Sequence, residues 1–150
     1  NLSYIESEYD DYTFNFVGPI AGFSQRSGDQ TPRQPKNTMS AYVSHEFSLF
    51  DQGGYWRLDW FHQGESYVDE SNLAKLDSYN LFNLRIGLEW ENLMAELFVM
   101  NLTDESAWQT GARWTDFSSP SQFAYLTAKQ GVAVSPLDKR EVGLRLNWKF

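Results

Sequence analysis

The sequence predicts an all-β fold, an antiparallel up-and-down meander of about six strands. Six segments alternate apolar and polar residues with the period of a strand, so each has one apolar and one polar face. The connections between these segments alternate between short turns and long segments. Compact soluble domains seldom carry several long structureless loops, whereas transmembrane β-barrels have short turns on one side and long loops on the other. The pattern therefore favours part of a transmembrane β-barrel.

Composition narrows the class of protein. The chain of 150 residues is long enough for one domain, and its 17% aromatic content fits strands and membrane interfaces. A net charge of −8 disfavours nucleic acid as a partner, because neutralising phosphates needs clustered Lys and Arg. The absence of cysteine excludes disulfides and thiolate chemistry. No signal peptide is recognisable and Asn1 already lies in a strand, so we expect the carboxy-terminal piece of a longer protein.

The first three strands are predicted over Leu2–Tyr9, Thr38–Phe50 and Tyr55–Gln63. The first is short. In the second and third, alternate apolar residues form one face: Met39, Ala41, Val43, Phe47, Leu49, Trp56, Leu58 and Trp60. Asp51–Gly54 is rich in residues that tolerate positive φ and is predicted as the turn between them. This turn would place Leu49 opposite Trp56 and Phe47 opposite Leu58.

The last three strands are predicted over Tyr79–Trp90, Leu93–Asn101 and Glu141–Phe150. Glu91-Asn92 fits a two-residue hairpin turn. The register that this turn sets brings apolar residues together in four pairs: Trp90–Leu93, Leu88–Ala95, Ile86–Leu97 and Leu84–Val99. A slip of one residue would invert every face, so the agreement supports the register. Glu141–Phe150 shows the cleanest alternation and ends on an aromatic residue.

Aromatic residues gather at the short-turn ends of the predicted strands. They are Phe50, Tyr55, Trp56, Trp90, Trp148 and Phe150. We interpret the first five as a girdle at a membrane interface. Trp56, Trp90 and Trp148, together with Phe150, share the parity of the apolar face and would form a ring at one height. Phe50 and Tyr55 have the opposite parity and fit only if the turn redirects them. The alternative is ordinary aromatic packing at the end of a soluble sandwich.

No catalytic residue, metal site or cofactor is predicted. His45 and His62 fall on the apolar-face parity, whereas Glu46 and Asp59 fall on the polar-face parity, so they point apart. The polar-face carboxylates interleave with arginines, as cross-strand pairing requires: Glu46, Asp59, Glu89, Glu96, Arg57, Arg85 and Arg145.

The chain resembles the carboxy-terminal part of TonB-dependent outer-membrane receptors over essentially all of its residues. Three stretches carry this resemblance. Thr31–Asn37 is similar to the proline-bracketed run before a late barrel strand; Leu84–Asp104 is similar to the last tight hairpin with its Asn-Leu-Thr-Asp exit; and Arg140–Phe150 is similar to the closing strand. Each motif is weak alone, and their order and spacing make the resemblance fairly specific.

The resemblance implies a large plugged barrel of about 22 strands, of which this chain would supply the last six. It implies a transport receptor in the bacterial outer membrane, not an enzyme, in contact with outer-membrane lipid. Its cargo would be a scarce nutrient, most often a ferric siderophore, less often haem, cobalamin or a glycan. Transport would be driven by the TonB complex through a plug domain that these residues do not include, and polar-face charges would contact that plug. The closing residues Leu144, Leu146, Trp148 and Phe150 would form the signal that the barrel-assembly machinery reads.

The long connections are the expected ligand-binding surface, since loops on a rigid scaffold carry recognition. The candidates are aromatic residues and arginines that suit an anionic ferric siderophore: Phe14, Phe16, Arg26, Trp108, Arg113, Trp114, Phe117 and Tyr125. The equal alternative is that these side chains pack the loops against one another.

Two other classes of protein remain open. One is another outer-membrane barrel, such as a porin or a surface enzyme. The second is a soluble carbohydrate-binding β-sandwich, which the alternating segments also permit. We expect the six strands alone not to fold stably in water, because one face of the sheet would expose Leu and Trp.

Overall fold

A computed structural model describes residues 1–15, 22–115 and 130–150 of the chain. Within these ranges the fold is all-β, and no helix long and apolar enough to span a membrane occurs among these residues. The strands are β1 (Leu2–Tyr4), β2 (Asn37–Leu49), β3 (Gln52–Gln63), β4 (Ser66–Tyr67), β5 (Lys75–Leu76), β6 (Tyr79–Glu89), β7 (Leu93–Met100), β8 (Trp108–Thr115), β9 (Gln130–Pro136) and β10 (Glu141–Trp148).

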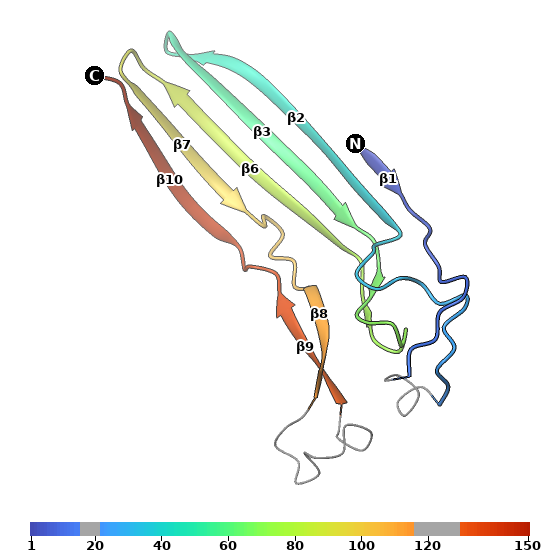
Figure 1. Ribbon diagram of the computed structural model, residues 1–150. Coiled ribbons are helices and arrows are strands. Elements are labelled where there is room, and N and C mark those ends of the chain that lie inside the picture. The colour runs from blue at the N-terminus through green and yellow to red at the C-terminus, as the bar shows by residue number, and fades with distance from the viewer. Residues whose placement is uncertain (16–21, 116–129) are drawn as a thin grey trace.

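Six of these strands form one antiparallel sheet in the order β1-β2-β3-β6-β7-β10. Each strand lies beside its neighbour in the chain, so the predicted up-and-down meander is confirmed (Figure 1). The short turns lie at one end of the sheet, and the long connections lie at the other (Figure 1). The described residues place no second sheet on the six strands, so the soluble sandwich is not the architecture of this part of the chain.

The first strand is shorter than predicted. It ends at Tyr4 and not at Tyr9, although the Ile5 amide still donates to the Lys36 carbonyl (3.0 Å). Beyond that point the chain leaves β2 and pairs locally, through isolated bridges from Glu8 to Gln30 and from Thr13 to Gln25. The backbone groups of this segment therefore find partners in its own loop.

The turn between β2 and β3 differs from the prediction. Phe50 and Asp51 both have positive φ (52° and 64°), so they form the two-residue turn themselves. Phe47 therefore pairs with Gly54 and not with Leu58, a shift of four residues. Gly54 lies inside the strand because the Phe47 ring fills the space above it, where an added Cβ would lie 2.6 Å from Phe47 Cε2. An even shift keeps every side chain on its predicted face.

The hairpin of β6 and β7 has the predicted register. Leu84, Ile86 and Leu88 pair with Val99, Leu97 and Ala95, and the Trp90 amide donates to the Leu93 carbonyl at 2.7 Å. β10 then pairs with β7 along its whole length, from Glu141 opposite Met100 to Trp148 opposite Leu93. The alternation identified the faces of all three strands, and the predicted turn identified the register of β6 with β7.

Two of the connections predicted as loops contain short hairpins, β4–β5 and β8–β9. β8 follows β7 closely because Asn101 stabilises the bend between them. Its side-chain amide donates to the carbonyls of Glu105 and Asp138, both at 2.9 Å. The sequence of β8 does not predict a strand, because Gly111 and small residues interrupt the alternation of apolar and polar residues. A small apolar core forms at the end of the sheet where the long connections lie. Its buried residues are Val68, Leu76, Tyr79 and Leu137.

Candidate functional site: two faces of one sheet and the surface above it

One face of the sheet is apolar across five strands. The register places apolar side chains in successive rows, in which Ile86 lies between Trp56 and Leu97, and Leu84 lies between Leu58 and Val99. Several of these side chains are exposed within this chain: Val43, Leu49, Ile86, Trp90, Leu97, Val142, Leu144, Leu146 and Trp148. An exposed apolar surface of this extent indicates contact with a membrane or another apolar partner.

Polar groups bound this apolar face at its loop end. Asn80 Oδ1 accepts hydrogen bonds from Trp60 Nε1 (3.0 Å) and from His62 Nδ1 (3.1 Å), since a carbonyl oxygen cannot donate. From Asn80 to Trp90 the strand runs about 33 Å at about 3.3 Å per residue. A tilt of about 40° would reduce this length to about 25 Å, the height of the apolar band of a membrane barrel.

The structure corrects the predicted girdle at two positions. Tyr55 lies on the polar face, where its hydroxyl donates to Glu96, so it is not part of a ring on the apolar face. Trp56 pairs with Ile86 and therefore lies four residues farther from the turns than Trp90. Trp90 and Trp148 do line one shallow hollow together. Phe50 is 89% exposed in its turn. The girdle remains a prediction for Phe50, Trp90 and Trp148.

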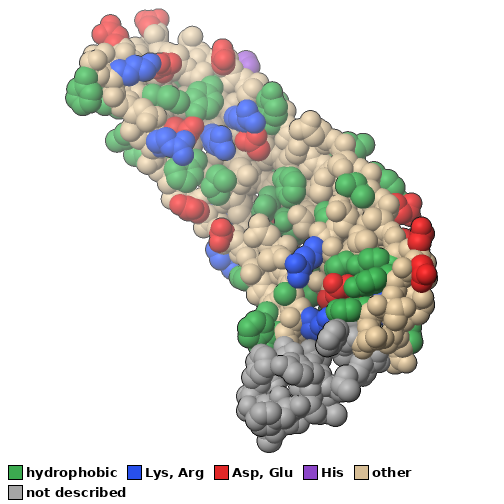
Figure 2. Space-filling view, viewed as in Figure 1, with side chains coloured by type: hydrophobic (Ala, Val, Ile, Leu, Met, Phe, Trp, Pro, Cys, Tyr) green, Lys and Arg blue, Asp and Glu red, His purple; other side chains and the backbone are tan. Residues whose placement is uncertain are grey.

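The polar face is organised around Glu96, which is only 5% exposed. Its carboxylate accepts from the Tyr55 hydroxyl and from Arg145 NH1 (2.5 Å), so one acid joins β3, β7 and β10. The Tyr55 ring reaches Glu96 by crossing β6 at Gly87, where an added Cβ would collide with the ring. In the same way, the Phe98 ring lies over Gly143 on β10. Figure 2 shows charged side chains of both signs gathered over the strands on this face.

A second charged group lies farther toward the loops. Asp59 Oδ1 accepts from Arg57 Nε (2.8 Å) and NH2 (2.6 Å), and the Arg57 guanidinium stacks on the Tyr42 ring at 4.0 Å from its centroid. Near the turns Lys149 pairs with Glu89 at 3.3 Å. Arg57 and Asp59 lie on the same strand, so the predicted cross-strand pairing of polar-face charges is confirmed for Glu96 with Arg145 and not for Asp59.

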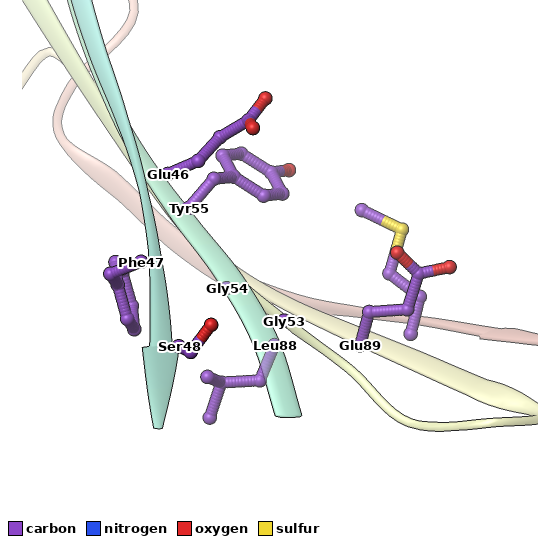
Figure 3. Close-up of a pocket in the computed structure, with 9 residues that line it drawn as sticks. Glu46, Phe47, Ser48, Gly53, Gly54, Tyr55, Leu88 and Glu89 are labelled. Atoms are coloured by element: carbon purple, nitrogen blue, oxygen red, sulfur yellow. The ribbon is translucent and has the colours of Figure 1, made fainter. Parts of the chain in front are cut away.

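A hollow of about 600 Å³ opens at the turn end of β2, β3 and β6, next to Gly53 and Gly54. In Figure 3, Glu46 and Tyr55 extend from one face of the sheet, whereas Phe47 and Leu88 extend from the other. The residues that line the hollow therefore come from both faces of the sheet, next to two glycines that carry no side chain. The hollow does not bring the polar groups of its lining to one point.

Arg26 has a structural role, which corrects its prediction as a ligand-binding residue. The side chain is 1% exposed. Its guanidinium donates to the carbonyls of Gln25, Ser71 and Phe23 and pairs with Asp29 at 3.1 Å. These contacts use all three guanidinium nitrogens. They join the connection between β1 and β2 to the connection between β4 and β5, which contains Ser71.

Two of the predicted ligand residues, Phe14 and Arg113, lie together among the long connections. Tyr9, Tyr12 and Phe14 form a stacked series, with ring centroids 4.6 and 5.9 Å apart, and the Arg113 guanidinium lies 5.6 Å from the Phe14 ring. Arg113 also lies 3.5 Å from Asp69 and 3.9 Å from Glu70. Tyr9 and Tyr12 are not among the candidates from the sequence, although three aromatic residues within Tyr9–Phe14 are a visible signal.

Burial and a nearby acid act on Tyr9. Desolvation and the negative charge of Glu70 raise the pKa of the Tyr9 hydroxyl. Trp108 and Trp114 on β8 are 52% and 61% exposed. Phe16, Phe117 and Tyr125 lie outside the described residues, so their predicted role stays a prediction.

Comparisons with known proteins identify the fold. No family model matches the sequence, and no curated protein matches it. Among solved structures, the ferric yersiniabactin uptake receptor FyuA from Yersinia pestis is similar, with a TM-score of 0.68 and 19% sequence identity. The match covers 84% of this chain and 18% of that receptor, so the chain spans under a fifth of its length. The likeness shows that the six strands have the fold of part of such a receptor's β-barrel.

Proposed function

We propose that this chain forms the last six strands of the barrel of an outer-membrane receptor that imports a ferric siderophore, driven by the TonB complex. The observation that carries the proposal is the single-layered sheet with one apolar and one polar face, joined to its likeness to a ferric yersiniabactin uptake receptor. In this proposal the apolar face contacts outer-membrane lipid and the polar face lines the lumen.

The edges of the sheet support a larger barrel. β1 pairs with β2 only from Asn37 to Met39, so the outer edge of β2 has no partner from Ala41 to Leu49 in the described chain. Among the described strands, β10 has β7 as its one partner. Unpaired strand edges are very unfavourable in lipid, because each free backbone group lacks water as a partner. Further strands of the same protein would remove both edges by closing the barrel.

The ligand would bind at the end of the strands where the long connections lie. Trp108 and Trp114 present exposed rings there, and Arg113 lies beside Phe14. Aromatic rings suit stacking on a chelate with unsaturated groups, and Arg113, which already pairs with Asp69 and Glu70, would hold the Phe14 ring rather than supply a free positive charge. Phe16, Phe117 and Tyr125 are proposed for the same surface from the sequence alone.

The test is iron uptake by cells that express the complete receptor as their only siderophore receptor. We expect cells to accumulate radioactive iron from ferric yersiniabactin or another ferric siderophore, and to stop when TonB is deleted. Binding to the purified receptor should persist without TonB, which separates recognition from energy coupling. Solute flux that is independent of TonB and shows no saturable binding would support a porin and contradict the proposal.

A further inference from the structure

A hollow of about 280 Å³ opens where β8 begins, beside the short connection between β5 and β6. We call it the Trp108 hollow, because Trp108 lines it and is 52% exposed. Asp77 and Glu105 line it as well, and Ser78 and Ser106 add two hydroxyl groups. Neither Lys nor Arg is among the described residues that line it. The hollow therefore combines an exposed tryptophan with two acids.

Backbone hydrogen bonds hold the residues of this hollow in place. The side chain of Asn101 accepts from the Glu105 amide at 2.8 Å and donates to the Glu105 carbonyl at 2.9 Å. The Leu137 amide donates to the carbonyl of Ala107, the residue before Trp108, at 3.0 Å. A site whose backbone is already ordered loses little conformational freedom when a ligand binds.

The two acids keep their negative charge without a contacting cation. Within the described residues the Glu105 carboxylate forms no ion pair, and Glu105 uses its backbone in the contacts with Asn101. Asp77 forms no ion pair there either, and its charge acts on Lys75 at a longer distance. The Lys139 ammonium donates to Ser106 Oγ at 3.5 Å, so a primary ammonium already reaches the edge of the hollow.

We infer that the Trp108 hollow binds a protonated amine of the transported ligand, which would be a ferric chelate with a free primary ammonium group. The ammonium would lie against the indole face of Trp108, and the carboxylates of Asp77 and Glu105 would accept its N–H groups. An anionic group of the ligand would meet two like charges at the same point. The inference rests on the proposed function, because it names the ligand class of that receptor.

The first arm of the test is fluorine NMR of the complete receptor labelled with 5-fluorotryptophan, with the Trp108 resonance identified by its loss in Trp108→Phe. The probe is 4-aminobutan-1-ol, and the matched neutral probe is butane-1,4-diol. We expect the amine to shift the Trp108 resonance saturably and the diol to leave it unchanged. Asp77→Asn with Glu105→Gln should weaken amine binding about tenfold. Asp51→Asn, in the turn between β2 and β3, is the control for a lost negative charge.

The second arm measures binding of ferrioxamine B, a ferric trihydroxamate with one free primary ammonium, against its N-acetylated form. We expect the ammonium form to bind the purified receptor about tenfold more tightly, and the double variant to lose this preference. Equal response of Trp108 to the two small probes overturns the amine site. Equal binding of the two chelates, or binding of neither, overturns its assignment to the ligand. A receptor that imports no ferric siderophore contradicts the proposed function, while the first arm still decides whether the hollow binds an amine.

Discussion

The hydroxyl of Tyr55 on β3 donates a hydrogen bond to the carboxylate of Glu96 on β7, across the intervening strand β6. This contact is possible because Gly87 occupies the crossing point and pairs with both residues in the register. The same acid holds Arg145 on β10, so one side chain ties three strands together. A glycine within a strand usually weakens it, but here the aromatic ring covers the exposed backbone.

We predict that Gly87→Ala destabilises the barrel by about 1–3 kcal/mol, because the added methyl group collides with the Tyr55 ring and forces it away from Glu96. Denaturant unfolding of the complete receptor in detergent measures the loss. Gly53→Ala is the matched control, since nothing lies within 4 Å of a Cβ built there. Equal stability of the two variants would show that the ring does not depend on Gly87.

We predict that arginine on the apolar face is tolerated according to depth. Ile86→Arg should cost about 2–4 kcal/mol and Trp148→Arg about 0–1 kcal/mol, because Ile86 lies midway along the apolar rows and Trp148 near the turns. Leu84, Leu88 and Leu146 should give intermediate or large values. The measurement is unfolding of the receptor in lipid vesicles.

Asn147→Arg is the control for that series, because Asn147 lies on the polar face of the same strand as Trp148. We expect little change for this variant. Tolerance of arginine at Leu84, Ile86, Leu88 and Leu146 alike would refute the assignment of this face to lipid.

We predict that the ion pair between Glu65 and Lys75, among the long connections, stabilises the fold at neutral pH and not in acid. The Lys75 ammonium, at 2.7 Å, and then Lys36 lower the pKa of the Glu65 carboxyl below its usual 4.5. A lowered folded-state pKa contributes stability that is present above pH 4.5 and is lost as pH falls through the lowered value. Glu65 is well exposed, so solvent screening keeps the effect small.

The measurement is the melting temperature of wild-type receptor and Glu65→Gln between neutral pH and pH 3. We expect the wild type to melt higher at neutral pH and the difference to close in acid. A difference that is constant over this range would mean that the charge of Glu65 contributes nothing.

We predict that Arg26→Met reduces stability by about 2 kcal/mol, because it leaves three carbonyl groups and Asp29 without their charged donor. Ligand affinity should stay the same in the protein that remains folded. Trp108→Ala should do the opposite and weaken ferric siderophore binding with little change in melting temperature. A calorimetric titration and a thermal melt of each variant separate the two roles.

We predict that Phe150→Ala acts on assembly and not on stability. Phe150 follows β10 and is fully exposed in this chain, so its ring contributes no packing here. We expect less receptor in the outer membrane of growing cells and an unchanged unfolding midpoint for the receptor that is inserted. Asn147→Ala, on the polar face nearby, is the control. Normal membrane levels of Phe150→Ala would contradict its role in the assembly signal.

The sequence by itself determined the fold class and the faces of the strands in the six-stranded sheet. Side chains alternate across a strand with period 2, so the pattern Val142, Leu144, Leu146 and Trp148 needs no other information to define a face. It also determined the register of β6 with β7, because Glu91-Asn92 permits a single tight turn. It could not determine the β2–β3 register, since a shift of four residues leaves every face unchanged.

The tertiary structure alone decided which side chains meet. Tyr55 and Glu96 are 41 residues apart, and Arg26 and Ser71 are 45 apart, so no local pattern indicates either contact. The sequence treated Arg26 and Arg113 alike as aromatic-flanked cations. The fold buried Arg26 among carbonyl groups and left Arg113 beside the Phe14 ring. The physical reason is that alternation specifies the direction of a side chain, whereas its partner depends on which strands the turns and long connections bring together.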